Sequence, residues 1–190
     1  EGLKISRNNF INTGAEQITL KTILHVDISH NMLDQSSLSS ILLAPEGLAL
    51  NGIFITDNYI SPAQNQQEGI AVNAPEGSDG IVNVVITGNM IAYSGYGVKF
   101  GPNAKNVNVS NNIFSDIHHT AILFDRSQHA TITGNMVSAV QETLSVTDGQ
   151  AGGPFIIKDN HVMGVNSLNM TDKRNFVIGD NPGLDKAKNK

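Results

Sequence analysis

The middle of the chain carries a concentration of side chains that can move protons or carry charge. Two tyrosines, two histidines, two carboxylates and a lysine fall there: Tyr93, Tyr96, Asp116, His118, His119, Glu142 and Lys99. Histidine and tyrosine act as a general base and acid when their pKa values suit the reaction. A lysine can offset a substrate carboxylate, and an aspartate can orient a histidine. This set of groups fits the removal of a proton next to a carboxylate, provided that the fold brings them together.

The spacing of these residues predicts that they meet. Counted from Asn89 and Asn112, Tyr93 and Asp116 share one offset. Counted from Asn89, Asn112 and Asn135, a second offset is shared by Tyr96, His119 and Glu142. Equal offsets place residues in one column only if each asparagine marks the same point of a repeating unit.

Such a unit recurs eight times along the chain. A β-branched residue stands three positions before each asparagine, and an apolar residue stands two positions after all but the last. The asparagines are Asn8, Asn31, Asn58, Asn89, Asn112, Asn135, Asn160 and Asn181. They follow one another at intervals of 21 to 31 residues, which is the period of stacked supersecondary units.

Each unit contains three short strands separated by tight polar corners. Around Asn89 the strands are expected at residues 84–86, 90–92 and 98–100, with apolar side chains alternating along them. The sequence therefore predicts an all-β solenoid, a parallel β-helix of about eight rungs. Adjacent rungs would stack about 4.8 Å apart. An asparagine amide carries both donors and acceptors, so the corner asparagines are expected to form a hydrogen-bonded ladder.

The repeat resembles the right-handed parallel β-helix of the pectin-lyase-like superfamily. More narrowly, it is similar to the β-helix-repeat members, which include polysaccharide lyases, mannuronan C-5 epimerases and phage tailspike proteins. The resemblance covers residues 3 to about 183 and implies an extracellular protein, or one on a cell or virion surface, that meets a polysaccharide or other glycan along one flank. Residues 119–124 look like the rungs near the epimerase active site. The Asp-Pro-His motif of the epimerases is absent, since residues 96–103 lack both its Asp and its His.

Two functional hypotheses follow. In the first, the chain is a polysaccharide lyase, epimerase or hydrolase. His119 is then the base or acid with Tyr96 as its partner, Lys99 offsets the substrate charge and Asp116 orients the imidazole. Three further residues contact the substrate: Tyr93, His118 and Glu142. A hydrolase would instead pair Asp116 with Glu142, at a separation of about 5 to 9 Å.

In the second hypothesis the chain is a non-catalytic shaft or glycan-recognition module of an adhesin or tailspike. Tyr93 and Tyr96 would then serve as stacking platforms for sugar rings. The two hypotheses differ in whether titratable groups converge in a concave cleft, as an enzyme requires.

Insertions and chain ends complete the expected organisation. The segments 61–68 and 73–80 are rich in Pro, Gly and polar residues, so they are expected to be loops that wall one end of the site. Asp125, Arg126 and Asp148 are expected to form a salt network.

Residues 1–183 are expected to be one β-helix domain, the C-terminal part of a longer one, and residues 184–190 a charged tail. Because the strand pattern begins by Leu3, we expect self-association into a homo-oligomer or an N-terminal domain that covers this end.

Amino-acid composition and net charge restrict the classes of partner and ligand that the chain is expected to bind. Twelve basic against 17 acidic residues give a net charge of −5, which disfavours nucleic acid. The chain has no Cys, so disulfides and Cys-ligated metal sites are excluded. Membrane insertion is not expected, because no apolar run of 18 residues occurs. The six histidines lack zinc-site spacing, and no cofactor is expected. Calcium stays open as a ligand because Asp is frequent.

Overall fold

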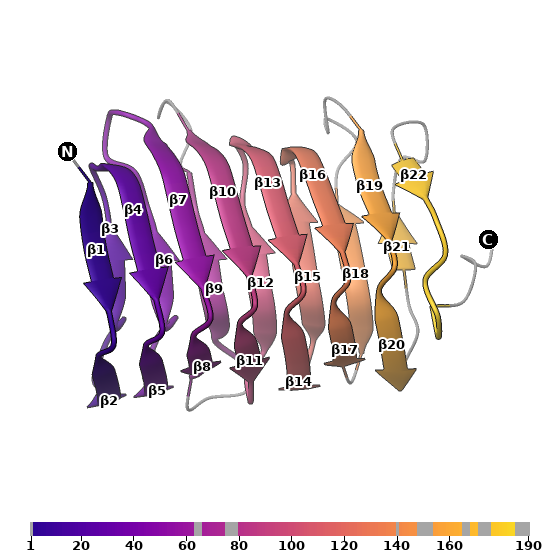
Figure 1. Cartoon of the computed structure of the whole chain (residues 1–190), viewed down its shortest axis with the longest axis horizontal. Coiled ribbons are helices and arrows are strands. Elements are labelled where there is room, and N and C mark those ends of the chain that lie inside the picture. The colour runs from indigo at the N-terminus through magenta and orange to yellow at the C-terminus, as the bar shows by residue number, and fades with distance from the viewer. Residues whose placement is uncertain are drawn as a thin grey trace.

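The protein winds into a regular solenoid. The computed structural model describes residues 2–62, 66–74, 80–139, 141–147, 154–164, 168–170 and 176–184. Within these residues the chain forms three parallel β-sheets and no helix, and the strands of each sheet stack along one axis (Figure 1). None of the described segments is therefore a helix that could cross a membrane.

The first sheet holds eight strands. They are β1 (Leu3–Ser6), β4 (Leu24–Ser29), β7 (Leu50–Thr56), β10 (Ile81–Thr87), β13 (Ala104–Ser110), β16 (Gln128–Thr133), β19 (Phe155–Lys158) and β22 (Phe176–Ile178). The second sheet holds seven: β2 (Asn9–Thr13), β5 (Met32–Ser36), β8 (Tyr59–Ser61), β11 (Met90–Ala92), β14 (Ile113–Ile117), β17 (Met136–Ala139) and β20 (His161–Gly164). The third also holds seven: β3 (Ile18–Leu20), β6 (Ile41–Leu43), β9 (Glu68–Val72), β12 (Tyr96–Phe100), β15 (Thr120–Asp125), β18 (Glu142–Thr147) and β21 (Leu168–Met170).

The prediction of a three-strand parallel β-helix is confirmed. Every strand pairs in parallel with the equivalent strand of the next rung, as in Leu3↔Val26 and Val84↔Val107. The count of rungs is slightly different from the prediction. The described residues form seven complete coils, and β22 is the single strand described of an eighth. The repeat counted eight because it registers one corner asparagine per coil, and Asn181 marks a coil without a described third strand.

The eight asparagines form the predicted ladder. The Nδ2 of each donates to the Oδ1 of the next, as from Asn89 to Asn112 at 3.0 Å and from Asn112 to Asn135 at 3.0 Å. The backbone N–H of each asparagine donates to the same oxygen. A second Nδ2 bond reaches the β-branched residue of the preceding coil, as from Asn112 to the Ile86 carbonyl at 2.9 Å. The side-chain amide thus pairs groups that the corner removes from the sheets.

The corner before seven of the eight ladder asparagines has a left-handed backbone. That position has φ between 54° and 69° at Arg7, His30, Asp57, Gly88, Asn111, Gly134 and Asp159. Gly, Asn and Asp tolerate this conformation best, which explains why they occupy most of these positions. The residue types at these seven corners therefore follow from one shared turn conformation.

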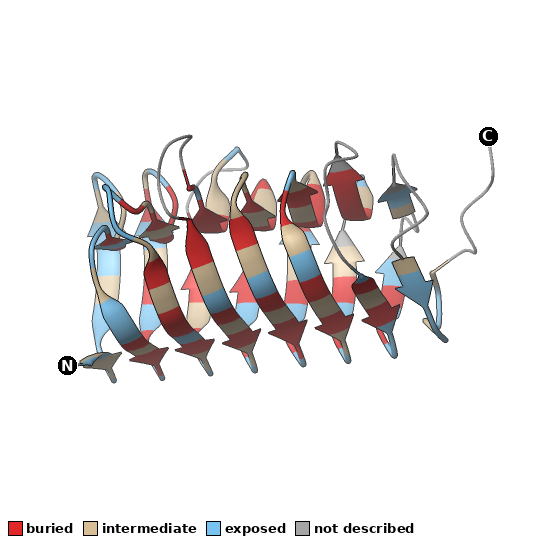
Figure 2. Ribbon diagram, turned by 90° about the horizontal axis from the view of Figure 1, so that it is seen from above, coloured by how far each residue is buried: buried red, intermediate tan, exposed pale blue. Residues whose placement is uncertain are grey.

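Aliphatic side chains fill the lumen of the solenoid, and toward the C-terminal end phenylalanine side chains pack there as well. Buried and exposed residues alternate along the strands (Figure 2). Phe100 stacks on Phe124 with ring centroids 4.6 Å apart, and Phe124 meets Phe155 edge-on at 5.2 Å. Phe155 in turn stacks on Phe176 at 5.2 Å. The core is a continuous column, so each rung is stabilised by its neighbours.

Candidate functional site

The predicted site residues gather where the second sheet turns into the third. Backbone hydrogen bonds join the corners of successive rungs there. His118 N–H donates to the Ser94 carbonyl, and His119 N–H donates to the Gly95 carbonyl, both at 2.8 Å. Glu142 N–H donates to the His119 carbonyl at 2.8 Å. The corners that carry these residues are therefore neighbours, as the offsets predicted.

The predicted column of Tyr96, His119 and Glu142 is wrong by one residue. The sheet register pairs Tyr96 with Thr120, and Thr120 with Glu142. The cause is a register shift in β14 between Phe114 and Ile117, where the partner strand β17 has one residue fewer. The additional residue delays the start of β15 by one position and leaves His119 in the corner.

Tyr96 and His119 nevertheless touch. Their ring centroids lie 5.3 Å apart with the planes inclined at 36°. Lys99, on the same strand as Tyr96, places its Nζ 5.2 Å from the centroid of the tyrosine ring. Three of the four predicted catalytic side chains thus form one cluster on β12 and the corner before β15.

The fourth predicted catalytic residue does not join them. Asp116 is exposed, has a φ of 53° and accepts a hydrogen bond of 2.8 Å from the Ser115 hydroxyl. Among the residues that the structure describes, no hydrogen bond or ion pair links Asp116 to either histidine. The predicted role of Asp116 in orienting an imidazole is therefore not supported. The shift in β14 explains this outcome, because Asp116 lies within it.

The predicted substrate-contacting residues are dispersed around the corner. Tyr93 is 56% exposed and also has a left-handed φ, of 52°. His118 is half-buried. Glu142 accepts a hydrogen bond from the Thr120 hydroxyl at 3.2 Å and one from the Asn169 amide at 3.5 Å. Glu142 begins a strand of the third sheet, whereas Asp116 belongs to the second, and their pairing as the two carboxylates of a hydrolase stays a prediction.

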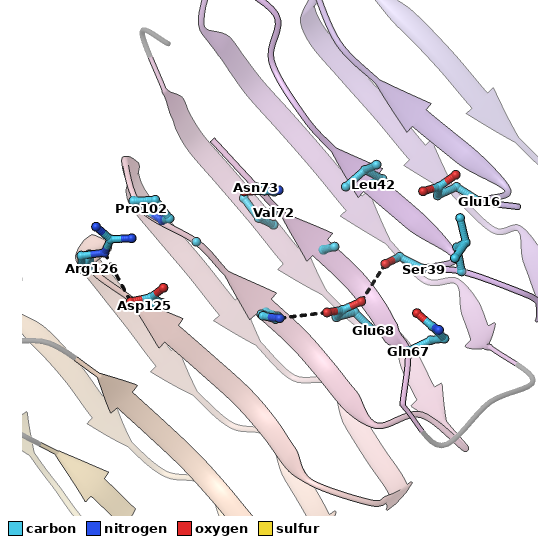
Figure 3. A pocket seen from close by; sticks show the side chains of 14 residues that line it. Glu16, Ser39, Leu42, Gln67, Glu68, Val72, Asn73, Pro102, Asp125 and Arg126 are labelled. Atoms are coloured by element: carbon cyan, nitrogen blue, oxygen red, sulfur yellow. Dashed lines mark hydrogen bonds and ion pairs between the residues drawn. The ribbon is translucent and has the colours of Figure 1, made fainter. Parts of the chain in front are cut away.

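Beside this cluster a groove of about 570 Å³ runs across the outer face of the third sheet (Figure 3). It extends from Glu16, before β3, to Arg126, after β15. Leu42, Ala71 and Lys99 are register partners on adjacent strands within it. The small side chain of Ala71 between two longer ones leaves the hollow. Gln67 and Asn73, from the described ends of the two predicted insertions, also line the groove; residues 63–65 and 75–79 lie outside the described residues.

Four of the five charged side chains that line the groove form ion pairs. Lys99 Nζ lies 3.1 Å from Glu68 Oε1, and the Ser39 hydroxyl donates to Glu68 Oε2 at 2.9 Å. The Glu68 side chain is 17% exposed, so this pair is partly shielded from water. Arg126 Nε lies 3.5 Å from Asp125 Oδ1, as expected for that pair, while Asp148 lies outside the described residues.

A close approach inside the solenoid holds β12 in position under Lys99 and Tyr96. A Cβ on Gly97 would lie 2.5 Å from the Ala121 carbonyl oxygen and 2.6 Å from Cδ1 of Phe114. Only glycine fits this space, so the packing of Phe114 requires it. Phe114 is also the apolar residue two positions after the ladder asparagine Asn112, so a side chain of the repeat packs directly beneath the site.

Comparison with known families agrees with this architecture. A family model described as a right-handed beta helix region matches residues 1–181. The chain belongs to this right-handed β-helix family. No curated protein and no solved structure matches it. Membership establishes the solenoid and its handedness, and it leaves the chemistry of the groove to be argued from the residues that line it.

This β-helix also has functional candidates that the repeat did not reveal. Glu68 and Ser39 line the groove, and neither was predicted. The register that pairs Glu68 with Tyr96 becomes visible only once the strands are aligned. For metals, no three His, Asp or Glu side chains converge within the described part of this β-helix, so no calcium site is assigned.

Proposed function

We propose that this β-helix binds an extended polysaccharide in the groove on the outer face of its third sheet. The observation that carries the proposal is the groove itself, with an apolar floor at Leu42 and Ala71 and polar groups around it. Ligand sites are concave, mainly apolar surfaces with a few placed polar groups. A sugar chain has apolar ring faces and hydroxyl edges, which match such a lining.

The direction of the groove supports a long ligand. It extends from Glu16 on the rung of β3 across β6, β9 and β12 to β15, and the rung spacing of about 4.8 Å gives a track of roughly 20 Å. A polymer that lies along the solenoid axis would meet the same kind of position on each rung. We propose accordingly that the protein acts outside the cell, or on a cell or virion surface, where long glycans are met.

The experiment is a glycan array followed by calorimetric titration of the polysaccharides that bind. Ala71→Trp fills the middle of the groove and should reduce affinity at least tenfold. Met90→Trp is the control, since Met90 is exposed on the second sheet and does not line the groove. Equal affinities for these two variants and the unaltered protein would remove the groove from the account. Thermal unfolding of each variant verifies that the solenoid is intact.

A second candidate function is catalysis at the edge of the groove. The observation that favours it is the contact between Tyr96 and His119, with Lys99 beside the tyrosine ring. Histidine and tyrosine are a suitable acid–base pair. If they act so on a bound polymer, His119→Ala should lower turnover about 100-fold or more. Tyr96→Phe separates the two functions, because it keeps the ring for stacking and removes the acidic hydroxyl. Unchanged turnover in both variants would exclude this catalytic pair.

A further inference from the structure

We infer that the groove selects neutral polysaccharides and discriminates against polyuronates, an inference that rests on the proposed glycan binding. The inference rests on the charged side chains that line the groove. Three carboxylates and two cations line the groove: Glu16, Glu68, Asp125, Lys99 and Arg126. The balance is negative, in a chain whose net charge is −5.

The two cations already face carboxylates of the groove. Lys99 is 3.1 Å from Glu68, and Arg126 is 3.5 Å from Asp125. Glu16 has no ion pair among the described residues. A uronate carboxylate that approached Lys99 would have to displace Glu68 or lie beside it. Displacement leaves a carboxylate that is 17% exposed without its cation, and proximity brings two like charges together.

Two further contacts hold the ion pair between Lys99 and Glu68 in place. The Ser39 hydroxyl donates to the Glu68 oxygen that does not face Lys99, at 2.9 Å. Lys99 also rests near the Tyr96 ring at 5.2 Å from its centroid. Glu68 comes from β9, Lys99 from β12 and Ser39 from the turn before β6, so three successive rungs fix this arrangement.

Neutral sugar hydroxyls suit the same lining. The groove carboxylates can accept hydrogen bonds from hydroxyl groups while they keep their cations, because each carboxylate has several acceptor positions. The amides of Gln67 and Asn73 offer donors and acceptors in one group. A hydroxyl also loses less hydration than a carboxylate on entering a partly dry groove.

The test compares neutral glucans, mannans and galactans with alginate and polygalacturonate of matched length. Binding is measured by titration in EDTA, so that a divalent cation cannot bridge the polyanions to groove carboxylates. The unaltered protein should bind at least one neutral polymer, at least tenfold more tightly than either polyuronate. Because a neutral polymer carries no net charge, that affinity should change little between low and high salt.

Glu68→Gln tests the cause of the selectivity. It keeps the shape of the side chain and an acceptor for Ser39, and it releases Lys99 from its carboxylate. Affinity for polyuronates should then rise on the order of tenfold, the size of one charge-assisted contact. Glu46→Gln is the matched control: it releases Lys21 from an ion pair of 2.7 Å and makes the same change in net charge away from the groove. This control should leave polyuronate affinity unchanged.

The outcomes separate the inference from the proposed function. Tighter binding of polyuronates than of neutral polymers by the unaltered protein overturns the inference and leaves glycan binding standing. An equal gain in Glu68→Gln and Glu46→Gln also overturns it, because net charge rather than the groove ion pair would then set selectivity. Failure to bind any polymer of either class rejects the proposed function together with the inference. The comparison of unaltered protein with the two polymer classes stands even if a variant does not fold.

Discussion

Lys99 on β12 and Glu68 on β9 face one another across neighbouring rungs, with 3.1 Å between Nζ and Oε1. They lie 31 residues apart in sequence, and the solenoid brings them together. Each belongs to a different row of the third sheet, since Lys99 is the register partner of Ala71 and Glu68 that of Tyr96. The ion pair therefore links the floor of the groove to the tyrosine at its edge.

The asparagine ladder predicts a large and local loss of stability when it is interrupted. Asn112→Ala removes the partner of the Asn89 amide and leaves the buried Ile86 carbonyl without its donor. The expected loss is about 3 kcal/mol of unfolding free energy. Asn9→Ala is the control, because Asn9 is exposed on β2 and its side chain makes no hydrogen bond within the described residues; it should cost less than about 0.5 kcal/mol. Denaturant unfolding measures both, and equal losses would contradict the ladder.

The close approach at Gly97 predicts a second sensitive position. Gly97→Ala forces a Cβ against the Ala121 carbonyl oxygen and the Phe114 ring, which should destabilise the fold by about 1–3 kcal/mol or more. Gly14→Ala meets no atom within 4 Å and should be near neutral. Thermal melts of the two variants provide the comparison. A Gly97→Ala protein as stable as Gly14→Ala would show that β12 is not packed as described.

The ion pair between Lys4 and Asp27 predicts a small dependence of stability on pH. The hydrogen bond from Lys4, with Nζ 3.0 Å from Oδ2, lowers the pKa of Asp27 below 3.8, and partial burial offsets part of this effect. A folded-state pKa below the unfolded one means that the contribution is present above the unfolded pKa. It is lost as pH falls through the folded pKa. The Asp27 side chain is 37% exposed, so solvent screening limits the effect to about 0.5 kcal/mol or less.

Lys4→Met should therefore reduce stability at neutral pH by that amount, and the difference from the unaltered protein should vanish below the folded-state pKa of Asp27. Lys105→Met is the control, since Lys105 has no ion pair among the described residues. Unfolding curves at several pH values test this. A Lys4→Met difference that persists in acid would assign the effect to packing of the lysine stem instead.

The sequence was sufficient for the solenoid because each rung repeats the same physical requirement. The amide of Asn112 needs Asn135 on the next coil, so the asparagines had to recur. Offsets counted along equal rungs also predicted that the corners of Tyr96 and His119 are neighbours, although the sheet register pairs Tyr96 with Thr120. These predictions rest on interactions within the repeat, which appear as a pattern of residue types.

Interactions that depart from the repeat could not be counted in this way. The register shift in β14 moved Asp116 and His119 out of the positions that the offsets predicted. In the sequence this shift is visible only as a start of β15 one residue later than in the neighbouring rungs. Glu68 is the last residue of the predicted insertion 61–68, in the longest interval, whereas the structure makes it the first residue of β9, so no offset from Asn58 places it opposite Tyr96. The groove lining therefore emerged only from the pairing of the strands.

The most direct measurement is a nuclear magnetic resonance titration of methyl-labelled protein with the best-bound polysaccharide. The account predicts concentrated shift changes at Leu42 and Ala71 on the third sheet. It predicts none at Met90 and Ile113, which are exposed on the second sheet and serve as internal controls. Saturating ligand that perturbs Met90 and Ile113 while Leu42 and Ala71 remain unchanged would contradict glycan binding in the groove.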